Sequence, residues 1–327
     1  MLSSVETIEV YRPVETATAV AGSLRVAFVR LRPPDSTVAH RQVKSLLSVL
    51  RVVCTLTLAW QVFDDAPVAV AANRDERLER DSISPDVYSE EPRVVAPQDA
   101  EAGGTWIGYN EFGVFAGITN RWIDHELAGD RSRGLLVADV LKARSAAEAA
   151  ALVEDTTAAD EYDGFHLVIA DAENAYCYQW DGDLEITEFD PGVHVVVNVA
   201  VDDDADVPSA RADAARAQAE NGREIRKELS VLTDERGEPT ETVTAWLERA
   251  GDVLGDHEYG VCLHENGFGT RSSSLIAIGP EQSPPAARYS FAAGPPCQTE
   301  YDRLEVSLSE PETETDTTSE VDDERHI

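Results

Sequence analysis

Short runs of apolar and β-branched residues, separated by turn residues, recur along most of the chain and predict β-strands. Two hairpins are expected first, comprising residues 54–63 with 67–72 and residues 105–109 with 114–118. Further strands are expected at 165–170, 175–180, 184–187, 193–197, 259–263, 273–278 and 288–292. Because tight turns join many neighbouring runs, these strands are expected to pair in antiparallel fashion.

Three segments carry apolar residues at helical spacing instead. Residues 134–153 predict two helices broken near Ser145. Residues 209–232 and 241–254 predict amphipathic helices, the first with Ser209 as its N-cap. Strands followed by helices, and then by strands and helices again, favour an α+β fold with two stacked antiparallel sheets flanked by helices.

The net charge of the chain limits the classes of molecule that it can bind. The chain has 62 acidic and 27 basic residues, a net charge of −35, yet 43% of its residues are hydrophobic. A folded protein with an acidic surface is therefore expected, and no nucleic acid partner, because phosphates need a basic patch. Lysine is nearly absent and acids are spread along the chain. This pattern suits a cytosol of very high salt, where screening suppresses repulsion between like charges.

The two ends of the chain differ in composition from the middle. Residues 1–52 hold seven basic and four acidic residues, whereas the rest of the chain carries a net charge of −38. Residues 1–53 are therefore expected to be a non-native or disordered leader, with translation starting at Val53; a basic extension that is present and disordered is the alternative. Residues 54–298 are expected to form one domain, and residues 299–327 a disordered acidic tail. No apolar run reaches the roughly 18 residues of a membrane span, and a cytoplasmic location is expected.

Cysteines and histidines give no metal signature along the chain. The four cysteines contain no CxxC pair, and Cys177 and Cys262 lie in strand-like runs, where small core residues are expected. No metal is predicted, because five histidines share no metal-binding spacing: His125, His166, His194, His257 and His264.

Cys54 is the most informative residue, because it opens a β-branched run and Asn73-Arg74-Asp75-Glu76 follows one hairpin later. This arrangement is typical of N-terminal nucleophile hydrolases of the cysteine type. A first-residue cysteine supplies a thiol with a pKa near 8.5 and an α-amine with a pKa near 8, so the amine can take the thiol proton. An internal Cys54 has no such amine, which is why the leader is expected to be absent.

Four motifs in order resemble the NRDE family, also called the Transport and Golgi Organization protein 2 family. They are Cys54-Thr55, Ala71-Ala72-Asn73-Arg74-Asp75-Glu76, Gly103-Gly104-Thr105-Trp106-Ile107-Gly108 with Thr119-Asn120, and Asn198 with Gly269-Thr270-Arg271-Ser272. The family is similar in turn to cysteine N-terminal nucleophile enzymes such as penicillin V acylases. The resemblance implies a four-layer αββα sandwich.

The resemblance also implies a role for each site residue. Cys54 would attack a carbonyl carbon, Asp75 would hold its α-amine, and Arg74 would lower the thiol pKa. Asn120 and Asn198 would donate to the oxyanion, and Arg271 would support the site electrostatically. Plainer alternatives stay open: Arg74 and Asp75 as a structural ion pair, and Asn120 or Asn198 as turn residues. Gly103-Gly104-Thr105-Trp106 is expected to be scaffold, with two glycines for a tight turn and Trp106 near the pocket, and a direct ligand role is the alternative.

The expected function is hydrolysis of an amide in a small acylated compound through a thioester on Cys54, with no cofactor. The alternative is a binding protein, because members of the resembled family are implicated in haem trafficking and in lipid or acyl-coenzyme A homeostasis. Haem would then be a ligand, for which the sequence offers no specific motif. The sequence does not indicate an oligomeric state.

Overall fold

The computed structural model describes residues 54–237, 239–280, 286–306 and 308. The expected leader, residues 1–53, lies outside the described residues, as does most of the expected acidic tail, at residues 309–327. Among the described residues, no helix has the length and apolar character that crossing a membrane requires.

The first sheet carries the long hairpin that opens the domain. Its principal strands are β1 (Thr55–Phe63), β2 (Ala66–Arg77), β10 (Gly192–Val197), β14 (Phe268–Ile278) and β15 (Ala287–Ala292). Short strands complete it: β11 (Ala200–Val201), β12 (Asp204–Ala205), β13 (His264–Glu265) and β16 (Asp302–Arg303). The order is β12-β11-β10-β1-β2-β14-β15-β16, β13 pairs with β14, and every pairing is antiparallel.

The second sheet is a meander whose strands follow one another in space as they do in sequence. They are β3 (Ser82–Glu90), β4 (Arg93–Asp99), β5 (Ile107–Asn110), β6 (Phe115–Asn120), β7 (Phe165–Ala170), β8 (Ala175–Trp180) and β9 (Leu184–Glu188). All of its pairings are antiparallel. Short turns join β5 to β6, β7 to β8 and β8 to β9, as the sequence predicts, whereas residues 121–164 separate β6 from β7.

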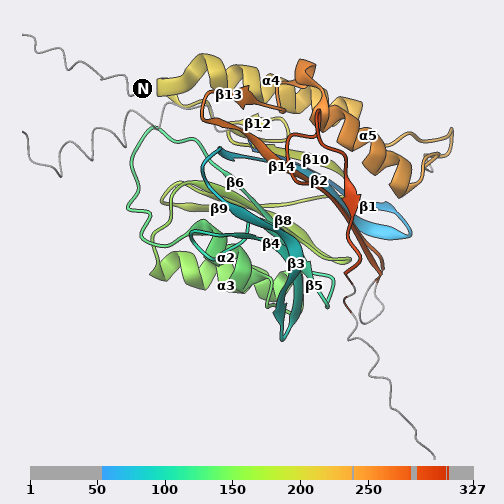
Figure 1. Cartoon of the computed structure of the whole chain (residues 1–327), viewed down its shortest axis with the longest axis horizontal. Coiled ribbons are helices and arrows are strands. Elements are labelled where there is room, and N and C mark those ends of the chain that lie inside the picture. Colours follow the sequence, from blue (N-terminus) through green and yellow to red (C-terminus); the bar gives the residue numbers. More distant parts are fainter. Residues whose placement is uncertain (1–53, 238, 281–285, 307, 309–327) are drawn as a thin grey trace, which may run out of the picture. The chain divides into compact units, whose positions relative to one another are not determined.

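Four α-helices among the described residues cover the two outer faces of the sheets (Figure 1). α4 (Ala212–Glu228) and α5 (Val243–Gly255) pack on the first sheet, and α2 (Arg133–Val140) and α3 (Ala146–Ala159) pack on the second. Separate apolar clusters lie under each helix pair and between the sheets. The αββα sandwich expected from the sequence is therefore confirmed.

The central strands read as continuously apolar because both of their faces are buried. In β1 the large side chains Leu56, Leu58 and Trp60 enter the cluster between the sheets, whereas Ala59 faces the helices. In β2 Ala69 also faces the helices. Small residues on the outer face leave room for the bulkier side chains of the helices, including Trp246 of α5.

Several boundaries differ from the expectations. β2 continues to Arg77, and residues 259–263 hold part of a 3₁₀ turn, η2 (His257–Tyr259), instead of a strand. A second turn, η1 (Ser209–Arg211), precedes α4, so the α-helix is capped at Arg211 and not at Ser209. The expected break at Ser145 is confirmed, since its side chain caps α3 by accepting from the backbone of Glu148.

The hairpin of β3 and β4 was not expected, because β3 is polar and lies at the sheet edge, with Ile83 53% exposed.

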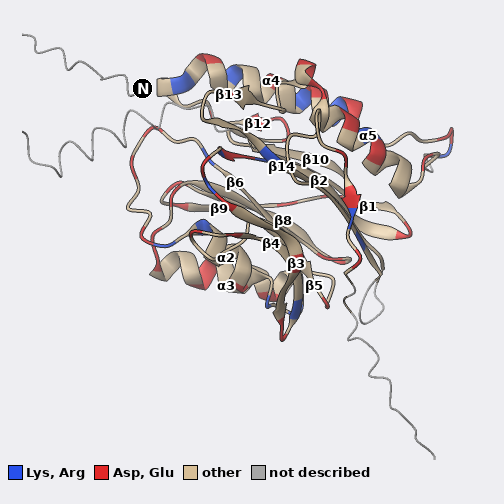
Figure 2. Ribbon diagram, in the orientation of Figure 1, with Lys and Arg blue, Asp and Glu red and all other residues tan. Residues whose placement is uncertain are grey.

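The expected acidic tail overlaps residues that pack on the domain: β16 pairs with β15, and Leu308 is buried between the sheets. Acidic residues mark the helices and connecting loops, whereas the strands are mostly uncharged (Figure 2).

Candidate active site

Strand register brings the predicted motifs to one end of the first sheet. Cys54 directly precedes β1, whose first residue, Thr55, pairs with Val197 of β10 on one side and with Asn73 of β2 on the other. Asp75 of β2 pairs in turn with Thr270 of β14. Cys54 and Thr270, which are 216 positions apart in sequence, are thus separated in the sheet only by β2.

A cavity of about 120 Å³ opens at this end, between the two sheets. Both sheets and the start of α2 line it, through residues that include Cys54, Arg74, Asp75, Trp106, Asn120 and Arg133. Three arginines and three acids take part in the lining, so the cavity mixes opposite charges in a confined space. Such a cavity can bind a small polar compound and hold it against Cys54.

Cys54 is 8% exposed and is held through its backbone. Its nitrogen donates to Oδ1 of Asn198 at 2.9 Å, and its Sγ lies 3.8 Å from the carbonyl oxygen of Asp75. Burial, followed by the charges of Asp75 and Glu76, raises the pKa of the thiol to about 12, and Arg74 opposes this shift only weakly. The expected lowering by Arg74 is therefore outweighed.

Asn198 is fully buried, and both the oxygen and the nitrogen of its side-chain amide form hydrogen bonds. Oδ1 accepts from Cys54 and from Nε2 of Gln218, and Nδ2 donates to the backbone carbonyl of Asn120 at 2.5 Å. The amide that was expected to face an oxyanion is thus directed at the second sheet. In this arrangement Asn198 holds the backbone of Cys54 and is not among the residues that line the cavity.

Asn120, the other predicted oxyanion donor, lines the cavity. It ends β6, in the sheet opposite Cys54, and lines the cavity beside Thr119 and Ile118. Its backbone carbonyl is fixed by Asn198, which anchors the end of the strand. Of the two predicted donors, Asn120 is the one whose residue borders the cavity.

Asp75 is a buried acid with an incomplete set of partners. It is 2% exposed, its Oδ1 accepts from the Thr270 hydroxyl at 2.5 Å, and its Oδ2 has no hydrogen-bond partner. Burial raises its pKa well above the ordinary range, although the Thr270 hydrogen bond and the charge of Arg74 oppose the shift. An unpaired buried carboxylate oxygen is costly and suits a cationic group placed beside it.

Arg74 stacks on an aromatic ring and pairs with acids other than Asp75. Its guanidinium lies 4.2 Å from the centre of the Trp106 ring, and its Nη2 lies 3.5 Å from Asp99 and 3.8 Å from Glu76. Asp99 also pairs with Arg80 at 2.7 Å. The network fixes Arg74 in one orientation at the cavity wall.

Arg271 lies outside the cavity lining, and Arg133 lies inside it. Arg271 follows Thr270 at a register shift in β14 and donates to the backbone carbonyl of Leu78. Arg133 begins α2 and donates to the carbonyl of Gly164 at 2.7 Å. Loss of water around Arg133 lowers its pKa. Its position beside Cys54 depends on the packing of a helix that contributes no predicted motif, so the sequence did not indicate it.

The glycine pair before Trp106 has a steric role. A Cβ on Gly104 would lie 2.3 Å from the backbone of Gly134, so only glycine allows this loop to approach the start of α2. Thr105 donates its backbone N–H to the carbonyl of Gly134, which completes the contact. The motif thereby places both Trp106 and Arg133 in the wall of the cavity.

Within the described residues, the lining of this cavity contains no histidine, and Cys54 is its only thiol. Histidine and thiolate are the usual protein ligands of haem iron. A haem in this cavity would therefore depend on the proposed nucleophile itself for an axial ligand.

Two solved structures show limited similarity to this chain. A penicillin V acylase from Agrobacterium tumefaciens shares 15% identity, with 73% of this chain and 83% of that chain covered and a TM-score of 0.41. An N-acylethanolamine-hydrolyzing acid amidase ortholog from Caenorhabditis elegans shares 11% identity, with 68% and 92% covered and a TM-score of 0.43. Likeness at this level does not assign an activity.

Sequence comparison gives a clearer relationship. A Transport and Golgi organization protein 2 homolog from Bos taurus is 27% identical over 240 residues, covering 66% of this chain and 86% of the relative. A homolog from Homo sapiens is 25% identical over 250 residues, with the same coverage. The family model described as Transport and Golgi organisation 2 matches residues 53–284. The match begins one residue before Cys54 and spans most of the described domain, so the chain belongs to the Transport and Golgi organisation 2 family.

Proposed function

We propose that this protein is an N-terminal nucleophile amidohydrolase that cleaves a small acylated compound through a thioester on Cys54. One observation carries the proposal: the backbone nitrogen of Cys54 is held by Oδ1 of Asn198 at the edge of a cavity that the Cys54 residue lines. A nitrogen fixed in this way would become a correctly placed base if it were a free amine.

The thiol needs that base. Because burial raises the pKa of the thiol to about 12, almost none of it is ionised at pH 7 while residue 53 remains attached. A peptide nitrogen cannot accept the proton, whereas an α-amine with an ordinary pKa near 8 can. Activity therefore requires that residues 1–53 be absent, so that Cys54 is the first residue.

The expected reaction proceeds in two halves. Sγ attacks the carbonyl carbon while the α-amine of Cys54 takes the thiol proton. The oxyanion accepts a hydrogen bond from Asn120, and its collapse breaks the C–N bond as the α-ammonium returns the proton to the leaving amine. Water then attacks the thioester, with the same amine as base, and releases the carboxylic acid and the thiol.

The surrounding charges favour this chemistry. The α-ammonium formed when the amine takes the thiol proton would add a cation to the cavity that Asp75 also lines, and this charge would lower the cost of the buried carboxylate. Arg74 and Arg133, whose charges favour the ionised form of Cys54, would stabilise negative charge on the sulfur.

The test compares two proteins that differ only at the bond before Cys54. A protease site placed directly before Cys54 yields a chain that begins with this residue, and the matched control is cut so that Val53 remains. Both are assayed on a panel of fluorogenic N-acyl amides, together with Cys54→Ala in the first background. We expect turnover only in the protein that begins at Cys54. Equal activity with Val53 retained, or in Cys54→Ala, would refute the mechanism.

A further inference from the structure

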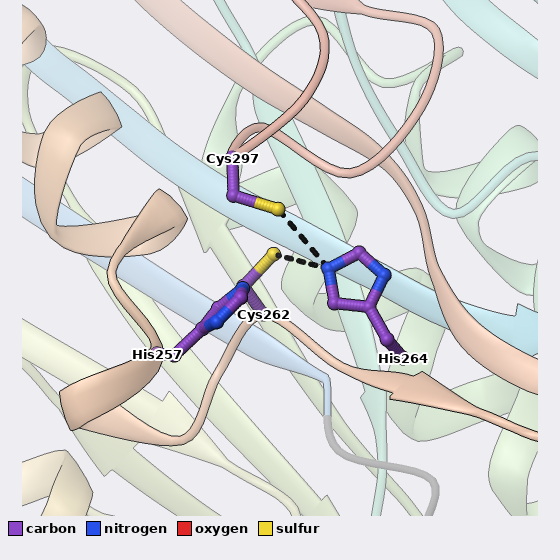
Figure 3. Close-up of side chains that lie close together, drawn as sticks. All are labelled: His257, Cys262, His264 and Cys297. Carbon is purple, nitrogen blue, oxygen red and sulfur yellow. Dashed lines mark hydrogen bonds between the residues drawn. The ribbon is translucent and has the colours of Figure 1, made fainter.

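Two cysteines and two histidines converge beside β13, three of them within residues 257–264 and the fourth at residue 297. His257 lies in η2, Cys262 lies in the loop after it, His264 lies in β13, and Cys297 follows β15. One ligand atom from each residue lies within 4.8 Å of the others. Figure 3 shows the two sulfur atoms and the His264 ring directed toward one another, with His257 beside them.

The distances are close to those of a tetrahedral zinc site. Zn–S bonds near 2.3 Å and Zn–N bonds near 2.0 Å place the ligand atoms of a tetrahedron about 3.3–3.8 Å apart. Nε2 of His264 lies 3.0 Å from Sγ of Cys297 and 3.8 Å from Sγ of Cys262. The rings of His257 and His264 have their centres 5.2 Å apart. Shifts of about 1 Å or less would bring all four atoms onto one ion.

We propose that His257, Cys262, His264 and Cys297 bind one zinc ion as a Cys₂His₂ site. Binding would release the protons of the two thiols and leave two thiolates and two neutral imidazoles on the metal, so its charge is balanced. Cys262 is buried, whereas the other three residues are exposed, so the site has one fixed ligand and three that can adjust from the solvent side. A soft donor set of this kind favours zinc over magnesium or calcium.

Four protein ligands leave no open position, so the metal would have a structural role. It would tie the segment around Cys297 to the β13 region. Leu263, between two of the ligands, donates its backbone N–H to Oγ1 of Thr270, and Thr270 donates to Asp75. The site would thereby stabilise the loop that fixes the partner of a proposed active-site carboxylate.

The sequence predicted no metal, because its histidines and cysteines do not have the spacing of a known metal-ligand motif. His257 and Cys262 are five positions apart, and Cys297 is 33 positions beyond His264, which matches no short ligand motif. Only the fold brings Cys297 to the other three residues.

The test measures zinc in the purified full-length chain. The protein is dialysed against zinc and then against metal-free buffer, and its zinc content is measured by elemental mass spectrometry of an acid digest. About one zinc per chain is expected. Cys297→Ser should lose most of it, and substitution at this exposed residue is expected to leave the fold intact. Cys54→Ala and His125→Gln are controls that change a thiol and an imidazole elsewhere, and both should retain zinc. Cobalt in place of zinc should give a thiolate charge-transfer band that Cys297→Ser lacks.

Three results would overturn the proposal. The first is a chain that retains no zinc. The second is zinc retained equally by Cys297→Ser and by the original chain. The third is peptide mapping that finds a disulfide between Cys262 and Cys297 under conditions in which zinc is available and the remaining thiols are reduced.

Discussion

The backbone nitrogen of Cys54 and the side chain of Asn198 are joined by a hydrogen bond of 2.9 Å, and the same side chain holds the end of the opposite sheet. Nδ2 of Asn198 donates to the carbonyl of Asn120, while Oδ1 also accepts from Gln218. One buried amide therefore fixes the proposed nucleophile, the proposed oxyanion donor and a residue of α4 relative to each other.

Replacing Asn198 with alanine should reduce kcat on the order of 100-fold in the protein that begins at Cys54, because the α-amine would lose its fixed position. The free energy of unfolding should fall by about 1–3 kcal/mol, since buried groups lose their partners. Steady-state kinetics and urea unfolding measure the two effects. Asn174→Ala, an asparagine in a turn of the second sheet, is the matched control and should change neither strongly. Wild-type kcat in Asn198→Ala would contradict the positioning role.

Asn120→Ala should lower kcat about 10²–10³-fold, because it removes the donor to the oxyanion. Its stability should change little, since Asn198 binds the backbone carbonyl of residue 120 and not its side chain. The KM should remain within a few-fold of the original value. A variant that weakens binding alone, with kcat unchanged, would assign Asn120 to the ground-state complex instead.

Asp75→Asn in the full-length chain should keep or increase the melting temperature at neutral pH. The folded-state pKa of Asp75 is raised, so the buried carboxyl opposes folding at pH values above its ordinary pKa of 3.8, and an amide removes this cost. In the protein that begins at Cys54 the same change should abolish turnover. Thermal melts at several pH values follow the first effect, whose size should grow as the pH rises from 4. A large loss of stability would indicate an ion pair instead.

His166 should make the protein sensitive to acid. Burial, followed by the charge of Arg121, lowers the pKa of His166 to about 3, and a hydrogen bond with the backbone of Val197 only partly opposes this. The unfolded chain binds this proton near pH 6.5 and the folded chain near pH 3, so stability falls as the pH drops through this window, by about 1.4 kcal/mol per unit. Urea unfolding of His166→Gln should show a weaker pH dependence than the original chain. Identical slopes would argue that His166 is already charged in the folded state.

The site shows what a sequence can and cannot predict. The apolar runs identified most of the strands, because turn residues mark their ends, and Cys54, Asp75 and Asn120 could be named from local motifs. Arg133 could not be named, because its place in the cavity wall follows from the contact between two glycine-containing segments. Asn198 was identified as a site residue, but the direction of its amide depends on partners that only the fold supplies.

The melting temperature should rise with salt concentration. With a net charge of −35, the acidic side chains repel one another in dilute buffer. Ionic strength near 1 M shortens the screening length to about 3 Å and so weakens this repulsion. Thermal unfolding in increasing concentrations of potassium chloride measures this directly. A melting temperature that does not depend on salt would refute the adaptation to a saline cytosol that the composition suggests.

The most direct test of the proposed mechanism is to trap the acyl-enzyme. The protein that begins at Cys54 and the control that retains Val53 are mixed with an acyl probe carrying a good leaving group, quenched in acid, and examined by intact mass and peptide mapping. We predict one acyl group, located on Cys54, in the first protein and none in the control over the same interval. Equal labelling of both proteins, or an acyl group on another residue, would contradict the mechanism.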